Sequence, residues 1–253
     1  VAQISNKDLV KVPASNIGQL ITGKLPGVMA RQSNGAPGSD GVTMLVRGYT
    51  SFKGNSLPLV IVDGIERPMD RLDPNDIETI SVLKDAAAGA VYGMKAANGV
   101  ILITTKKGAK GKATVSYNGT MTFSHNTALP KFLNGTQYMQ WYNRARELDG
   151  LNTPENPYFT DEEIAMTMNG DPTDGYENTN WMEPLDRMAP MHQHNLSVTG
   201  GNDNVKYYVS GGYMDQRGFI RDFKMQRGNF RSNVDVKATE DISVTLNVSG
   251  RLE

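Results

Sequence analysis

The chain has 253 residues, a formal net charge of −1 at pH 7 and no cysteine. A near-neutral charge gives no electrostatic reason to expect nucleic acid as a partner. The lack of cysteine excludes disulfides, thiolate metal sites and thiol nucleophiles. No apolar run approaches the roughly 20 residues that a membrane-spanning helix needs. Any segment of this chain that spans a membrane would therefore have to be a β-strand.

Residues 1–108 predict a compact β-rich unit with small helices. Apolar positions between Asn16 and Leu25 are spaced as on one helix face, and Pro26 with Gly27 ends that helix. The run Pro58–Val62 is continuously apolar, which is typical of a strand covered on both faces. In chain order, the expected elements are a strand at residues 1–4, a helix at 16–25, a loop at 31–41, strands within 42–48 and 58–64, a small helix at 86–92 and a strand at 99–105.

A run of four lysines at residues 106–112 marks a boundary, and we interpret it as a solvated linker rather than a phosphate-binding patch. After it, apolar and polar residues alternate, most clearly over Thr114–Ser124 and Ile242–Ser249. Weaker alternation covers Val205–Tyr213 and Arg231–Val236. Alternating segments of about ten residues are typical of transmembrane β-barrel strands.

The same alternation is also expected of a soluble antiparallel sheet with one buried face. Two observations favour the barrel. The polar face is rich in Ser, Thr and Asn rather than Lys and Glu. Short connections at 200–204 and 237–241 also alternate with long ones at 125–191 and 215–224, which is how outer-membrane barrels are connected.

The long connection has helical segments of its own. Residues 136–148 have helical spacing. Thr160 and Glu163 fit a capping box that starts a second helix through Met168, which Gly170 ends. Long loops on a rigid scaffold commonly carry binding function.

Several short strings resemble the SusC/RagA-type TonB-dependent outer-membrane transporters, in order and at the expected spacing. In the first half they are Leu25-Pro-Gly27, Gly35-Ala-Pro-Gly38, Val46-Arg-Gly48, Val62-Asp-Gly64, Leu83-Lys-Asp85, Tyr92-Gly93 and Ala97–Lys106. Downstream, Asn195–Gly201, Tyr207–Ser210 and Tyr213–Gly218 resemble the first barrel hairpins of that family.

The resemblance implies an α+β plug domain at residues 1–110, with a small mixed sheet and short helices. Residues 111–253 would then be the N-terminal part of a transmembrane β-barrel, with about five antiparallel strands and a long, partly helical extracellular loop at 125–191. A family barrel has about 22 strands, so we expect this sequence to be the plug and opening strands of a longer protein.

The function implied by the resemblance is active transport of an oligosaccharide or oligopeptide nutrient across the bacterial outer membrane. The plug closes the barrel until TonB gates it, and no enzymatic step or cofactor is involved. The implied partners are the TonB energy-coupling complex, a SusD-like surface lipoprotein and outer-membrane lipid, with no nucleic acid. The alternative is a soluble glycan-binding module with an α/β head and a β-sandwich tail. A hydrolase ranks third because no catalytic constellation can be assembled.

Charged residues close to apolar strands are expected to be paired. They could fix the plug fold, or break and reform their pairs during gating, and the sequence leaves both roles and the pairings open. The candidates for this plug network are Arg47, Asp63, Glu78, Lys84 and Asp85.

Aromatic residues in the long connection could stack on ligands or fill a small core. These candidates are Trp141, Tyr142, Tyr158 and Trp181. His192 and His194 share a face of an extended strand, but no third metal ligand is placed by spacing. Residues 171–175 resemble part of a calcium loop but lack its alternating ligands and closing Glu. We therefore predict no metal site.

Overall fold

The computed structural model describes residues 2–46, 48, 56–70, 72–84, 91–170 and 177–253. The chain divides into two compact units. Unit 1 comprises residues 1–124, 189–218 and 222–253, and unit 2 comprises residues 125–188 and 219–221. In the described ranges, no helix has the length and apolar character needed to cross a bilayer.

Unit 1 begins with the region predicted as the plug, residues 1–110, which we call the plug region. Its described elements are β1 (Ala2–Ser5), α1 (Asn6–Leu9), α2 (Ile17–Ile21), β2 (Val28–Gln32), β3 (Val42–Val46), β4 (Leu59–Val62), β5 (Ile65–Glu66), η1 (Pro74–Asp76), β6 (Ile77–Leu83), η2 (Gly93–Asn98) and β7 (Val100–Thr105). The strand order β1-β6-β7-β4-β5 makes a mixed sheet, in which β4 and β7 pair in parallel and the other pairs are antiparallel. This confirms the predicted mixed sheet with short helices.

The main core of the plug region lies between the sheet and the helices α1 and α2. Leu9, Ile17 and Ile21 from the helices pack with Ile80 of β6 and Ile103 of β7, and all five are buried. Burying a large aliphatic side chain contributes about 1.5–3 kcal/mol. This apolar core holds the plug region together.

Two local predictions differ from the structure. The helix predicted at 16–25 covers only Ile17–Ile21, with the Asn16 side chain accepting a hydrogen bond from the backbone N–H of Gly18. Residues 28–32 form β2 and pair with β3 from Val28–Val46 to Gln32–Val42, although residues 31–41 predicted a loop. Cross-strand pairing therefore outweighs the local loop composition. Most of the helix predicted at 86–92 lies outside the described residues.

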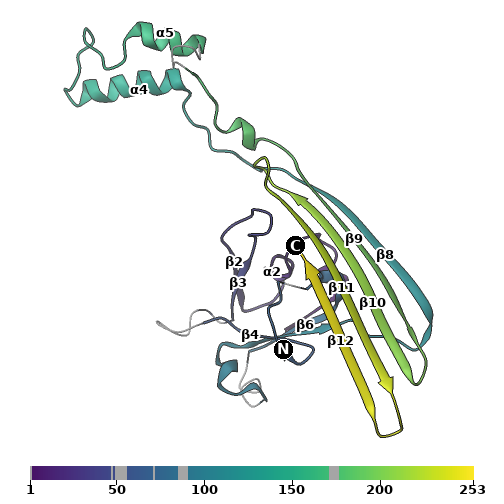
Figure 1. The fold of residues 1–253 in the computed structure, drawn as a ribbon. Coiled ribbons are helices and arrows are strands. Elements are labelled where there is room, and N and C mark those ends of the chain that lie inside the picture. The colour runs from purple at the N-terminus through teal and green to yellow at the C-terminus, as the bar shows by residue number, and fades with distance from the viewer. Residues whose placement is uncertain (1, 47, 49–55, 71, 85–90, 171–176) are drawn as a thin grey trace. The chain divides into compact units, whose positions relative to one another are not determined.

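The second part of unit 1 is a five-stranded antiparallel sheet (Figure 1). Its strands are β8 (Gly111–Ser124), β9 (Ala189–Gly201), β10 (Val205–Arg217), β11 (Lys224–Lys237) and β12 (Ser243–Leu252). Neighbours in the sheet are also neighbours along the chain, in the order β12-β11-β10-β9-β8. The five predicted strands are thereby confirmed.

The two faces of this sheet differ as the alternation predicts. On β10, Tyr208, Ser210 and Met214 are buried while Tyr213 is exposed. Large apolar side chains on the other face are exposed: Val115, Tyr117, Met121, Phe123, Leu196, Phe230, Val244, Leu246 and Val248. The described residues of β8–β12 form one sheet, and side chains of its inner face bond to the plug region. The β-sandwich tail of the alternative prediction is therefore not found.

The connection predicted at 215–224 is shorter than expected. Strand pairing continues to Arg217 and Lys224, so only residues 218–223 connect β10 and β11. Asp222 adopts a positive φ of 69° there. Similarly, β9 starts at Ala189 rather than after residue 191. The backbone hydrogen bonds of the sheet thus extend into segments whose polar composition predicted loops.

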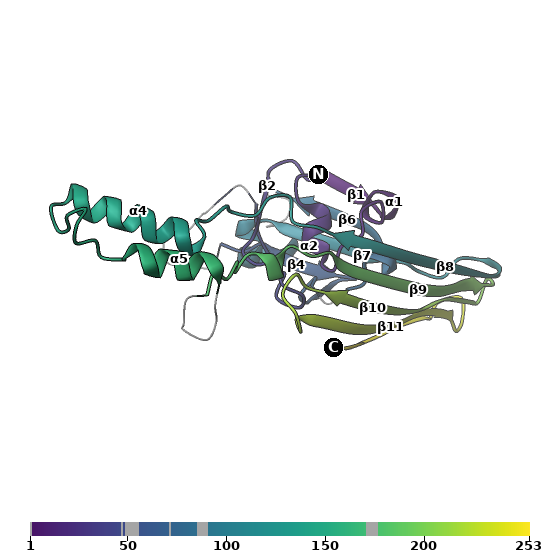
Figure 2. The same ribbon diagram turned by 90° about the horizontal axis from the view of Figure 1, so that it is seen from above.

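Unit 2 contains α4 (Gly135–Leu148), α5 (Asp161–Asn169) and the short helix η4 (Glu183–Leu185). The helices α4 and α5 lie side by side (Figure 2). The predicted capping box of Thr160 and Glu163 is confirmed, and Gly170 ends α5 in the left-handed conformation. A second capping box, formed by Asn134 and Gln137, starts α4.

Gly108, in the segment between β7 and β8, touches the backbone of β10. A Cβ atom added to Gly108 would lie 2.1 Å from the backbone N of Tyr207. Because backbone cannot move aside, we expect Gly108→Ala to lower the free energy of unfolding of the intact protein by about 1–3 kcal/mol. Gly211→Ala is the control, since its Cβ would meet nothing within 4 Å. Equal urea midpoints for the two variants would contradict this assignment.

Candidate functional site

Three carboxylates of the plug region lie where it meets the sheet formed by β8–β12. Asp63 follows β4 and adopts a positive φ of 50°. Asp73 caps η1, accepting a hydrogen bond from the backbone N–H of Asn75 at 2.8 Å. Asp76 is the last residue of η1 and is buried. The turns that end β4 and start β6 thus deliver all three acidic groups.

Asp63 is held in place by the adjacent strand β7. Thr105 donates its backbone N–H to one oxygen of Asp63 at 2.9 Å and its hydroxyl to the other at 2.7 Å. Residues in the left-handed region are strained unless their surroundings hold them. These two bonds fix the direction of the Asp63 carboxylate.

The inner face of the sheet supplies the partners of these carboxylates. Tyr208 and Ser210 of β10 donate hydroxyl hydrogen bonds to Asp76 Oδ1 at 2.9 and 2.5 Å. Asn233 of β11 donates its amide to Thr105 Oγ1 at 2.9 Å and to the carbonyl oxygen of Lys106 at 2.7 Å. Every one of these bonds joins the plug region to a strand.

Arg231 of β11 lies between two of the carboxylates. Its side chain is 3% exposed, with Nη1 3.8 Å from Asp63 Oδ2 and Nε 3.6 Å from Asp76 Oδ2. Arg231 Nε makes no hydrogen bond in the described part of the chain. A buried charge without close partners is costly. Arg231 therefore balances the acidic charge electrostatically without locking the two surfaces through short bonds.

Burial shifts the titration of two groups at this interface. Burial is the main cause that raises the pKa of Asp76, and neighbouring Asp73 raises it further, against the opposing effects of Ser210, Tyr208 and Arg231. Burial also lowers the pKa of Lys106, while Asp76 and Asp73 partly oppose that shift. Both shifts have the sign expected when charged groups leave water.

A second group of contacts surrounds Asp73. Asn195 of β9 and Asn229 of β11 each place an amide nitrogen 3.4 Å from Asp73 Oδ2. Gly212 of β10 permits this approach, because a Cβ there would lie 2.5 Å from the same oxygen. Any larger residue at 212 would push the carboxylate away from the sheet.

Further contacts join the sheet to the start of the plug region. Arg227 donates to the carbonyl oxygen of Ser15 at 2.9 Å, and Gln193 donates to that of Ala14 at 3.0 Å. Nearby, Met191, Met214 and Met225 form a small apolar cluster. We call the contacts between the plug region and β8–β12 the plug–strand interface.

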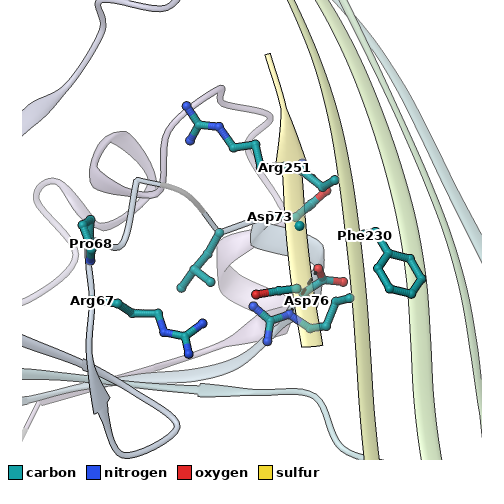
Figure 3. A pocket seen from close by; sticks show the side chains of 11 residues that line it. Arg67, Pro68, Asp73, Asp76, Phe230 and Arg251 are labelled. Atoms are coloured by element: carbon teal, nitrogen blue, oxygen red, sulfur yellow. Dashed lines mark hydrogen bonds and ion pairs between the residues drawn. The ribbon is translucent and has the colours of Figure 1, made fainter. Parts of the chain in front are cut away.

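A pocket of about 360 Å³ adjoins the carboxylates (Figure 3). Asp73 and Asp76 line it from the plug region, and Arg231 and Arg251 line it from the strands. Arg251 also donates to the carbonyl oxygen of Asp70 at 3.0 Å. A polar pocket of this kind provides room for water to reach the interface.

The described residues of the predicted plug network do not form a single cluster. Asp63 lies in the plug–strand interface, whereas Glu78 is exposed on β6. The Lys84 ammonium lies near Gly27, where an added Cβ would be 2.9 Å away. Arg47 and Asp85 lie outside the described residues.

Sequence reasoning missed Asp73, Asp76 and Arg231. A usable signal did exist in β11, where Arg227, Asn229, Arg231 and Asn233 recur at every second position and so share one face. Arg227 and Arg231 are both buried on that face, and buried arginines indicate acidic partners opposite them. Their identity depends on contacts between residues distant in sequence.

The four aromatic residues predicted as ligand contacts occupy three different environments in unit 2. Tyr142 and Tyr158 contact each other edge to face with ring centroids 5.1 Å apart, and Arg146 lies over both rings. Trp141 is exposed on α4. Trp181 lines a separate pocket in unit 2. Tyr142 and Tyr158 thus belong to a small packed cluster, and the two tryptophans do not.

Among the described residues, no group of three or more acidic or histidine side chains could hold a metal ion. His194 instead bonds to the hydroxyl of Tyr117 at 2.7 Å, and His192 lies two residues earlier on β9. The stretch 171–175 lies outside the described residues.

The chain is similar to known proteins over nearly its whole length. Residues 1–100 match the family described as TonB-dependent Receptor Plug Domain. The chain is 32% identical to TonB-dependent receptor P26 of Formosa agariphila, over 98% of this chain and 24% of that protein. It is 33% identical to TonB-dependent receptor SusC of Bacteroides thetaiotaomicron, over 95% of this chain and 23% of that protein. The chain thus spans about a quarter of these relatives.

Two solved structures are similar in fold to nearly the whole of this chain. The RagAB peptide transporter matches with a TM-score of 0.82 and 28% identity, over 99% of this chain and 30% of that chain. The siderophore receptor PirA from Acinetobacter baumannii matches with a TM-score of 0.58 and 19% identity, over 98% of this chain and 31% of that chain. The PirA similarity shows the fold alone.

We expect Arg231→Met to weaken the plug–strand interface by about 3–5 kcal/mol, because it leaves buried carboxylates without their cation. Arg217→Met is the control: that arginine is 60% exposed and 3.9 Å from Asp215, so its loss should cost about 0–1 kcal/mol. Adding Asp76→Asn to Arg231→Met should recover part of the loss. Hydrogen exchange of the plug region in the intact protein measures the effect, and equal protection in both arginine variants would contradict it.

A pH dependence follows from the raised pKa of Asp76. A raised pKa in the folded state means that this carboxyl stabilises the interface fully below its ordinary value of 3.8, and that the contribution is lost as pH rises through the raised value. Asp76→Asn keeps an oxygen that accepts from Tyr208 and Ser210 but does not titrate. We expect it to flatten the pH dependence of the urea midpoint above about pH 4, and an unchanged profile would refute the assignment.

Proposed function

Because the chain belongs to the SusC/RagA-type TonB-dependent receptors, of which it carries the plug domain and the strands that follow, we propose that it takes part in active import across the bacterial outer membrane. The plug region closes a β-barrel that β8–β12 begin. Force delivered through TonB displaces or remodels the plug so that the nutrient passes. No bond of the nutrient is made or broken, in keeping with a family of transporters rather than enzymes.

The polar plug–strand interface is the observation that carries this proposal. A typical intramolecular hydrogen bond contributes only about 0.5–1.5 kcal/mol net, since water can replace its partner. Contacts such as Tyr208 to Asp76 and Asn233 to Lys106 can therefore be exchanged for water as the plug moves. The apolar core of the plug region, by contrast, favours its staying folded.

The apolar outer face of the sheet supports the proposal that β8–β12 contact lipid. Val115, Leu246 and Phe230 belong to a broad set of apolar side chains that are about half exposed or more. A soluble protein seldom exposes so wide an apolar surface, whereas a barrel wall presents one to the hydrocarbon of the membrane. This surface disfavours the soluble glycan-binding module.

The partners in this proposal are the TonB energy-coupling complex and a SusD-like surface lipoprotein at the extracellular mouth. The nutrient is an oligosaccharide or an oligopeptide. RagAB is described as a peptide transporter, which supports a peptide for this chain only by similarity. Uptake measurements on the whole protein have to decide between the two classes.

A tether across the plug–strand interface tests the proposal. Asn118 of β8 donates to Asn75 of the plug region at 2.7 Å, and the chain has no cysteine. We expect full-length protein with Asn75→Cys and Asn118→Cys, joined through two disulfides by a short bis-methanethiosulfonate, to lose nutrient uptake and to regain it when a reductant cleaves those disulfides. The single cysteine variants are the controls.

Growth of a strain with the gene deleted identifies the nutrient for that assay. The deletion strain should lose growth on at least one oligosaccharide or oligopeptide source and regain it on complementation. The protonophore-treated parent should show the same loss of uptake, since TonB coupling needs an energised inner membrane. Unchanged growth on every oligomeric source would overturn the transport proposal.

A further inference from the structure

Unit 2 contains a pocket of its own. It has a volume of about 830 Å³, within the usual range for small-molecule sites. The pocket lies between the segment before α4 and the segment before and within η4. All of its described lining residues belong to unit 2.

Two large aromatic side chains of the pocket are turned to solvent. Trp181 is 78% exposed and Phe132 is 70% exposed. Tyr142 and Tyr158, by comparison, pack with each other and with Arg146. Exposed rings at a concave surface can stack on another flat apolar face. The alternating C–H groups of a pyranose ring provide such a face.

Four side-chain amides also line the pocket, and all four are oriented in the same manner. Each uses its oxygen to accept a backbone N–H: Asn134 from Gln137, Gln137 from Asn134, Asn178 from Gly135 and Asn180 from Met182, at 2.8–3.2 Å. Backbone donors fix which end of each amide is oxygen. Within the described part of the chain, the four NH₂ groups make no bond, which leaves preoriented donors.

Acidic side chains add hydrogen-bond acceptors to the amide donors of the pocket. Glu183 lines the pocket and makes no ion pair with any described residue, and Asp186 lies with Oδ1 3.4 Å from His125 Nε2. Lys131 is the one basic residue among its described lining residues. With two carboxylates and one ammonium, the pocket does not favour an anion. The backbone N–H groups of Asn134, Gly135 and Gln137 already bond to side-chain oxygens, so the start of α4 does not supply an anion site either.

We propose that this pocket binds a neutral oligosaccharide, with sugar rings stacked on Trp181 and Phe132 and hydroxyls bonded to the amide NH₂ groups and to Glu183. Sugar hydroxyls accept from NH₂ and donate to carboxylate, so the available groups match in both directions. A peptide offers no comparable match, because the pocket is lined by helix ends and connections without a strand edge for backbone pairing.

The test uses the purified full-length protein in detergent and isothermal titration with maltohexaose, cellohexaose, xylohexaose and mannohexaose. We expect binding of at least one of them with a dissociation constant of about 0.01–1 mM. Trp181→Ala should weaken it about tenfold or more. Trp141→Ala is the matched control, since that tryptophan is 64% exposed but does not line the pocket, and its affinity should stay within about twofold.

A second variant separates recognition from folding. Asn178→Asp retains the oxygen that accepts from the Gly135 N–H and removes only the NH₂ donor, so unit 2 should remain folded while affinity falls about threefold to tenfold. The proposal is overturned if no hexasaccharide binds, if Trp181→Ala and Asn178→Asp bind as the parent does, or if hexaalanine binds at Trp181 in place of sugar. Nutrient uptake in the same variants reports on import independently.

Discussion

The structure of unit 1 depends on the placement of buried charge at the plug–strand interface. Asp63, Asp73 and Asp76 come from turns of the plug region, and Arg231 comes from the strand β11. Removing these groups from water is costly, and the distances from Arg231 to its partners, 3.6 and 3.8 Å, are longer than those of tight ion pairs. The two surfaces thus bring opposite charges together without the short bonds of a tight ion pair.

The plug region combines two kinds of contact that respond differently to water. Its interior is aliphatic, with Ile80, Ile103 and Val82 fully or almost fully buried, and exposing that interior would lose the hydrophobic contribution. Its contacts with the strands are mostly hydrogen bonds to hydroxyls, amides and carbonyls. A pull on the plug region therefore meets less resistance at the interface than within the core, which suits a part that moves while retaining its fold.

Sequence patterns predicted those helices and strands whose signals lie within the element itself. The helix α5 followed from its capping box and Gly170, and the strands β8 and β12 followed from period-two alternation. The buried cluster could not be predicted in this manner, because Tyr208 and Asp76 are 132 positions apart. The strand β2 was missed for a related reason: its pairing with β3 is a tertiary contact that its own Arg31 and Gln32 do not reveal.

The strands β8 and β9 pair along most of their length, yet the whole of residues 125–188 separates them. Bringing the ends of so long a segment together costs conformational entropy that grows with the logarithm of its length. Unit 2 is built from local contacts, since α4 and α5 are neighbours in sequence and in space. If it forms first, it shortens the effective loop, so this insertion can act as a folding aid for the first hairpin of the sheet.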